Sequence, residues 1–108
     1  MIRVMLSLDL AKASDERDDF NKLLAKEKWK KLSKVDTVWV LRFDKYDQSS
    51  FKAIQKYVTQ FLLDAAKKLK LEKISFVAQI GDAKAIGCQI LKENGSYITS
   101  EFDPYVVD

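Results

Sequence analysis

Residues 1–10 read MIRVMLSLDL, and this stretch decides the fold because it predicts a strand at the centre of a sheet. Apolar residues predominate in it and alternate only imperfectly with polar ones. Such a run is typical of a strand that is buried on both faces. Asp9 ends the strand, and it is either a catalytic carboxylate or a residue that bonds to the amides of the following loop.

Two helices are expected from apolar residues at helical spacing. The longer one follows Ser49 and Ser50, either of which can cap its first turn. Its apolar face consists of Phe51, Ile54, Val58, Phe61, Leu62, Ala65 and Leu69. The shorter one follows Ser14 as a cap, with Asp15 and Glu16 in its first turn, where negative charge complements the helix dipole. Its apolar face consists of Phe20, Leu23 and Leu24.

Three further segments have the composition of strands. KWKKLSK (28–34) reads as a polar edge strand whose lysines discourage further pairing. DTVWVLRF (36–43) is rich in β-branched and aromatic residues and reads as a central strand that buries Trp39. KISFVAQI (73–80) is the next strand along the chain.

Residues 82–95 fit two structures. As a helix, the segment has Asp82 as its cap, an apolar stripe, and Gly95 as its end. As a strand, it runs into an Asn94-Gly95 hairpin turn and returns along residues 96–102. We favour the helix because the stripe and both caps agree.

The order strand, helix, strand, strand, helix, strand predicts a ferredoxin-like βαββαβ sandwich of the α+β class, with both helices on one face of an antiparallel sheet. We expect one domain over residues 1–108, with residues 82–108 as a C-terminal helix or hairpin extension. The usual strand order, 4-1-3-2, brings Asp9 and Asp36 to one edge of the sheet. The opposite edge then carries Asp44, Asp47 and Asp82.

The chain has no histidine. Imidazole is the usual general base near neutral pH and the commonest ligand of transition metals, so catalytic triads, histidine-dependent ribonucleases and most zinc sites are excluded. The three glycines match no phosphate-binding loop. An enzyme of this composition depends on carboxylates with a hard metal such as Mg²⁺, or on lysine.

Lysines are concentrated in two runs, residues 22–34 and 67–73, whereas the last sixteen residues contain four acids and no base. A concentrated positive charge suits the phosphates of RNA or DNA, and it is also an ordinary device for solubility. The candidate nucleic-acid contacts in the first run are Lys26, Lys28, Lys30, Lys31 and Lys34. Trp29 lies among these lysines and suits either a stacked base or a dimer interface.

A single cysteine, Cys88, excludes an internal disulfide and fits the reducing cytoplasm, where we expect the protein to reside as a soluble chain without a membrane partner. Its thiol is expected to be buried as a small hydrophobic group. No apolar run approaches the length of a membrane span, and no secretory signal is evident.

Two motifs resemble a superfamily that includes the CRISPR adaptation protein that accompanies the integrase, the VapD ribonucleases and the GhoS antitoxin ribonuclease. MLSLDL (5–10) is similar to their first strand ending in an aspartate, and DTVWVLRF (36–43) to their aromatic-bearing strand. The resemblance covers roughly residues 1–80. It implies that Asp9 is a metal ligand paired with its copy across a dimer axis, and that Arg17 contacts phosphate.

Two hypotheses of function follow. The first is a dimeric nucleic-acid-associated protein, and within it a Mg²⁺-dependent ribonuclease in which Asp9 from two subunits holds the metal. The second is a non-enzymatic antitoxin or immunity protein that binds a toxin. We expect a homodimer, because a ferredoxin-like sheet leaves edge strands with unpaired backbone groups.

Overall fold

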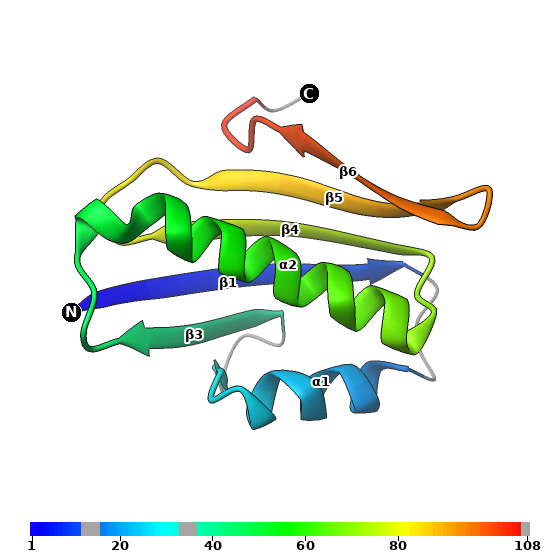
Figure 1. Ribbon diagram of the computed structural model, residues 1–108, viewed down its shortest axis with the longest axis horizontal. Helices are drawn as coiled ribbons and strands as arrows, with labels where there is room; N and C mark the ends of the chain where they lie inside the picture. The colour runs from blue at the N-terminus through cyan, green and yellow to red at the C-terminus, as the bar shows by residue number, and fades with distance from the viewer. Residues whose placement is uncertain (12–15, 33–36, 107–108) are drawn as a thin grey trace.

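The computed structural model describes residues 1–11, 16–32 and 37–106 of the chain. It shows one six-stranded antiparallel sheet with two α-helices packed on one of its faces (Figure 1). The strands are β1 (Ile2–Ala11), β2 (Lys30–Lys31), β3 (Val38–Phe43), β4 (Lys73–Ile80), β5 (Ile86–Glu93) and β6 (Ser96–Phe102). The helices are α1 (Arg17–Lys26) and α2 (Phe51–Leu69), the latter preceded by a short 3₁₀ turn, η1 (Gln48–Ser50).

The strands lie in the order β2-β3-β1-β4-β5-β6. The α+β class is therefore confirmed, with two more strands than the four-stranded sheet that we expected. The second half of β1 lies beside the start of β3, since Ser7 is paired with Val38 and the Leu8 N–H donates to the carbonyl of Thr37 over 3.0 Å. Asp9 therefore lies at the predicted end of the sheet, whereas Asp36 falls outside the described residues.

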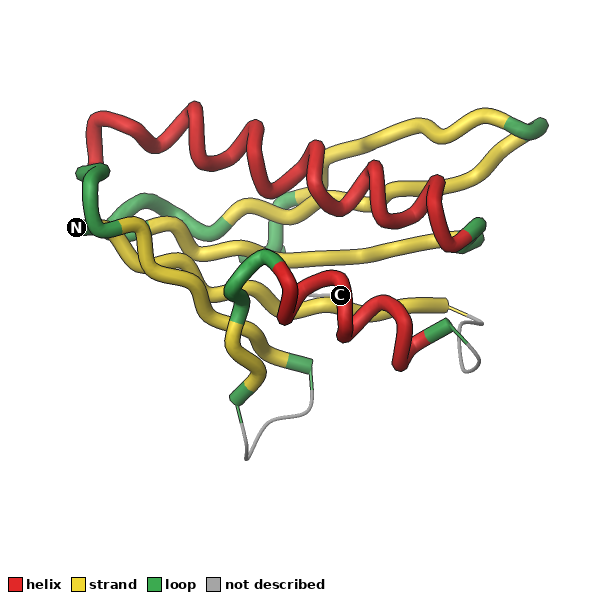
Figure 2. The backbone as a smooth tube through the Cα atoms, turned by 60° about the horizontal axis from the view of Figure 1, so that its bottom comes forward, coloured by secondary structure: helices red, strands yellow, loops and turns green. Residues whose placement is uncertain are grey.

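β1 alternates strictly between its two faces. Its even-numbered residues, Ile2, Val4, Leu6, Leu8 and Leu10, are buried against the helices. Arg3, Met5, Ser7 and Asp9 are exposed on the other face. The prediction that this strand is buried on both faces is wrong, because both helices cover the same face of the sheet and leave the other uncovered (Figure 2).

Both predicted helices are present. α2 buries the expected stripe, including Ile54, Val58 and Leu62, and Asp47 accepts a hydrogen bond from the Ser49 N–H just before it, over 2.9 Å. α1 buries Phe20 and Leu24, with Glu16 at its N-cap. The predicted cap of α1, Ser14, lies outside the described residues, as does Asp15.

The preference for a helix over residues 82–95 is wrong, and the alternative that we left open is the observed structure. β5 is followed by a two-residue turn in which Asn94 and Gly95 have φ values of 54° and 81°, and β6 returns along it. Such positive φ values at both positions are typical of a tight hairpin turn. β5 is paired with β4 from Ala78–Ile86 to Lys73–Leu91. This pairing satisfies backbone N–H and C=O groups, and a pattern of apolar residues within one segment does not reveal it.

The core contains only hydrophobic residues among those that the structure describes as buried. Trp39 and Cys88 belong to it, as predicted, with 5% and 6% of their surfaces exposed. Tyr97 ties β6 to the end of α2, because its hydroxyl lies 3.1 Å from the carbonyl of Ala66 and 2.8 Å from that of Leu71. No helix in the described part of the chain is long and apolar enough to span a membrane.

Candidate functional site

The uncovered face of the sheet carries a cross-strand pair of arginines. The register places Arg3 of β1 directly opposite Arg42 of β3, and both side chains are exposed. Two like charges in such a pair repel one another and destabilise the sheet. Arg42 has a partner in Asp44, at 2.8 Å, whereas Arg3 forms no ion pair with any described residue. The pair therefore favours an anion above it.

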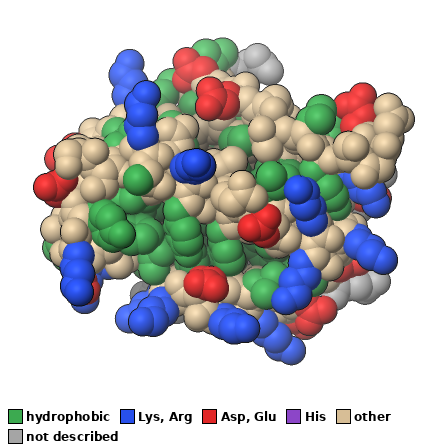
Figure 3. Space-filling view, in the orientation of Figure 1, with side chains coloured by type: hydrophobic (Ala, Val, Ile, Leu, Met, Phe, Trp, Pro, Cys, Tyr) green, Lys and Arg blue, Asp and Glu red, His purple; other side chains and the backbone are tan. Residues whose placement is uncertain are grey.

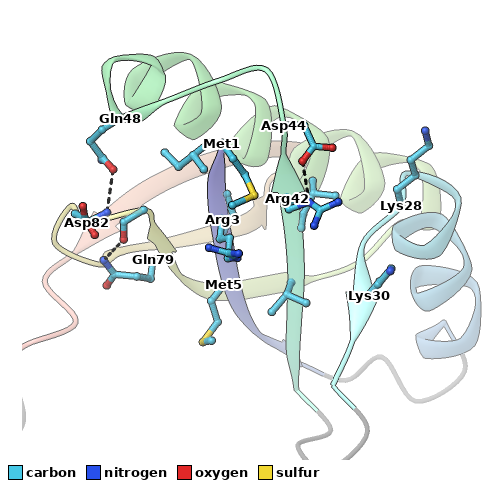
Figure 4. Close-up of a pocket in the computed structure, with 15 residues that line it drawn as sticks. Met1, Arg3, Met5, Lys28, Lys30, Arg42, Asp44, Gln48, Gln79 and Asp82 are labelled. Atoms are coloured by element: carbon cyan, nitrogen blue, oxygen red, sulfur yellow. Dashed lines mark hydrogen bonds and ion pairs between the residues drawn. The ribbon is translucent and has the colours of Figure 1, made fainter.

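A hollow of about 850 Å³ lies around this pair (Figure 4). Its cationic side chains are Arg3, Lys28, Lys30 and Arg42, and its carboxylates are Asp44 and Asp82. Met5 and Val40 add apolar surface to the same hollow, next to the cations. Met5 is 51% exposed, an unusual position for a large apolar side chain in a central strand. The hollow therefore combines positive charge with apolar surface.

The turn after β4 forms one rim of the hollow. The Gln48 side chain accepts a hydrogen bond from the Asp82 N–H over 2.9 Å and donates to the carbonyl of Ile80 over 3.3 Å. Gly81 has a φ of +57° and donates to the carbonyl of Arg3 over 2.9 Å. A Cβ at Gly81 would meet the side-chain ends of Gln48 and Ile2, which can move, and the positive φ is what favours glycine at this position. Asp44 and Asp82 both line the hollow at this end of the sheet, where the sequence predicted them to lie.

The opposite rim is set by the end of α1. Lys28 has a φ of +72°, the Lys28 N–H donates to the carbonyl of Ala25, and the Trp29 N–H donates to that of Leu24, both over 3.0 Å. These two bonds form a Schellman motif, in which the chain reverses at a residue in left-handed conformation. The reversal leaves Lys28 exposed at the hollow and buries Trp29 in the core.

The candidate nucleic-acid residues are distributed over two sides of the molecule. Lys28 and Lys30 line the hollow. Arg17 and Lys31 line a small recess on the helix side, next to Phe20 and Trp39. Lys26 is exposed in the last turn of α1, and Lys34 lies outside the described residues.

Trp29 is not available to a stacking base in this structure. Only 2% of its surface is exposed, and its Nε1 has no hydrogen-bond partner in the described part of the chain. The hollow is therefore built without it. Sequence reasoning missed Arg3 and Arg42, whose only signal was a charged residue at an exposed position of an alternating strand.

Asp9 is exposed on the uncovered face, opposite Ser75 of β4. It lies six residues along β1 from Arg3, about 20 Å away at about 3.4 Å per residue. Among the described residues no group of three or more metal-ligating side chains occurs. Asp36, which was predicted to lie at the same end of the sheet as Asp9, falls outside the described residues.

The helix side of the sheet carries a cluster of aromatic rings. Phe43 of β3 packs edge to face against Tyr46 and Tyr57, with ring centroids 5.7 and 5.8 Å apart, and Tyr57 stacks on Phe61 at 6.1 Å. Hydrophobic side chains gather at the centre of this side, and lysines and arginines lie around them (Figure 3). Burial raises the pKa of Tyr57, and nearby Glu27 raises it further. Phe43, Tyr57 and Phe61 are partly buried against the core, whereas Tyr46 is 48% exposed.

The fold and the hollow together define an α+β sandwich with one uncovered, partly basic sheet face. Comparisons with protein-family models, with curated proteins and with solved structures gave no significant match. The assignment of function consequently rests on the geometry of the chain itself.

The left-handed conformation of Lys28 generates a prediction. A residue with a Cβ pays about 1 kcal/mol in this conformation, which glycine avoids. Lys28→Gly is therefore expected to raise the free energy of unfolding by about 1 kcal/mol, measured by urea denaturation. Lys30→Gly, in the extended conformation of β2, is the control and should lower the stability; a destabilised Lys28→Gly would show that the motif is not formed.

Proposed function

We propose that the protein binds single-stranded nucleic acid on the uncovered face of its sheet. The observation that carries the proposal is the pair of exposed arginines in direct register, Arg3 and Arg42, flanked by Lys28 and Lys30 at one hollow. Phosphate groups neutralise such a cluster, and arginine suits them because its planar guanidinium binds two oxygens at once. Repulsion between the arginines in the free protein turns into attraction when phosphate is bound.

Single-stranded nucleic acid suits the hollow better than a duplex. Met5 and Val40 provide apolar surface beside the cations, on which an unpaired base can pack while its phosphate contacts an arginine. The uncovered sheet face offers no protruding helix that would enter a groove of a duplex. The balance of four cations and two carboxylates at the hollow also indicates moderate affinity.

We further infer that the chain from β1 to β4 forms a ferredoxin-like core. Taken from β4 outward, its four strands lie in the order β4, β1, β3, β2, with β5 and β6 added beyond β4. This arrangement supports the inference about fold and carries none about function, since such cores serve many activities.

Ribonuclease activity remains a separate hypothesis that rests on Asp9. A metal held at Asp9 would need further oxygen ligands, for example from a second chain or from the nucleic acid, because the described residues contain no group of three or more metal-ligating side chains. Binding at the hollow does not depend on it.

The binding proposal is tested by its dependence on salt. Contacts to phosphate release counterions, so the logarithm of affinity for a single-stranded oligonucleotide falls with the logarithm of salt concentration by about 0.7 per contact. Replacing Arg3 and Arg42 together by glutamine is expected to weaken binding and to reduce this slope by about 1.4, measured by fluorescence anisotropy.

The matched control is the double replacement of Lys52 and Lys56 by glutamine, which removes the same charge from exposed positions of α2 on the other side of the sheet. It should leave the slope within about 0.3 of the parent value. Equal effects of the two double variants would contradict a site at the hollow. No binding by the parent protein would reject the proposal and favour a protein-binding module of the antitoxin or immunity type.

The role of Asp9 is tested separately. Because Asp9 is exposed and lies about 20 Å from Arg3, Asp9→Asn is expected to leave nucleic-acid affinity unchanged within about twofold and the free energy of unfolding within about 0.5 kcal/mol. The measurements are anisotropy and urea denaturation, with a ribonuclease assay with and without chelator. Mg²⁺-dependent cleavage by the parent that disappears in Asp9→Asn would contradict a protein that only binds.

A further inference from the structure

The two edges of the sheet differ in how they are protected. β2 forms one edge, contains two residues, and both are lysines. β6 forms the other edge with seven residues, SYITSEF, that pair continuously with β5 from Ser96 to Phe102. It contains no lysine, proline or bulge, which are the devices that normally prevent an edge strand from pairing.

The hairpin turn determines which backbone groups of β6 point away from β5. A two-residue turn makes Glu93 and Ser96 a hydrogen-bonded pair, and pairs of this type then alternate along the ladder. The Lys92 N–H, which donates away from β6 to the carbonyl of Glu72 over 2.9 Å, agrees with this alternation. The N–H and C=O groups of Tyr97, Thr99 and Glu101 therefore point away from β5.

Exposed apolar side chains gather at the same edge. Leu91 of β5 and Ile98 of β6 form a cross-strand pair on the uncovered face, with 38% and 48% of their surfaces exposed. Phe102 is 40% exposed and lies against Gly87, where an added Cβ would come within 2.6 Å of its ring. Exposed apolar residues beside an unprotected edge strand suit a contact with another protein surface.

We propose that β6 pairs in antiparallel fashion with β6 of a second copy of this chain, with Thr99 on the two-fold axis. This register uses the whole strand: Thr99 meets its own copy, Tyr97 meets Glu101 of the second copy, and the outward-pointing backbone groups of all three are paired. No two acidic side chains lie opposite one another, because Glu101, the only charged residue of β6, faces Tyr97. Ile98 of each copy becomes a diagonal neighbour of Ile98 and Phe102 of the other.

The resulting dimer has one continuous sheet with both uncovered faces on the same side. Seven strand spacings then separate β1 from its copy, about 34 Å at about 4.8 Å each. Two Asp9 carboxylates at that separation cannot share a metal ion. The proposal therefore replaces the dimer axis that the resemblance implied, and it is independent of nucleic-acid binding at the hollow.

Introducing a positive or a negative charge at Thr99 tests the proposal, because this residue is exposed and lies opposite Thr99 of the second copy in the proposed dimer. Thr99→Lys and Thr99→Glu place like charges opposite each other, so each is expected to weaken self-association at least about fivefold, measured by sedimentation equilibrium at low salt. An equimolar mixture of the two should associate at least about tenfold more tightly than either variant alone. Thr99→Ala, which removes no backbone group and adds no charge, should dimerise like the parent.

Three results would overturn the proposal. One is a parent mass of 12.4 kDa at protein concentrations up to about 1 mM, which would exclude a dimer of even weak affinity. Another is a dimer that both charged variants leave intact. The third is a mixture that associates no better than its components. Circular dichroism of each variant checks that the hairpin is folded. If a charged variant of Thr99 is unfolded, lysine and glutamate are introduced at Ile98 instead, because the two Ile98 side chains lie diagonally across the dimer axis.

Discussion

The alternation of β1 between a buried and an exposed face is the constraint on which the rest of the structure depends. Even-numbered residues from Ile2 to Leu10 fill the core beneath the helices, and odd-numbered residues face away from them. A shift of one residue in the pairing of β1 with β3 and β4 would expose the whole apolar set and bury Arg3 and Asp9. The cost of burying those charges holds the register in place.

The same register creates the features to which we assign function. Because both helices cover one face, the other face retains Arg3 opposite Arg42 at one end and Leu91 opposite Ile98 at the β6 edge. Charge is concentrated where we propose nucleic-acid binding, and apolar surface where we propose pairing of two copies. The two surfaces share one side of the molecule and are otherwise separate, so each can be disrupted without the other.

Local pattern predicted the elements whose stability is mainly local. The stripe of α2 is buried as its spacing indicated, and Trp39 lies in the core. The predictions were wrong or incomplete where pairing with a strand distant in the sequence determines the structure. Residues 82–95 fit a helix by their stripe and caps, but pairing with β4 and the Asn94-Gly95 turn make residues 86–93 a strand. Arg3 and Arg42 are 39 positions apart, and only the register of β1 and β3 shows that they are neighbours.

The central claim is that the uncovered sheet face is the binding surface. It is tested most directly by nuclear magnetic resonance of ¹⁵N-labelled protein titrated with a short single-stranded oligonucleotide. We expect amide shifts to move along β1 and β3 around Arg3, Met5 and Arg42, with those of α2 unchanged. Shifts confined to the helix side, around Arg17 and Lys31, or no shifts at all, would contradict the claim.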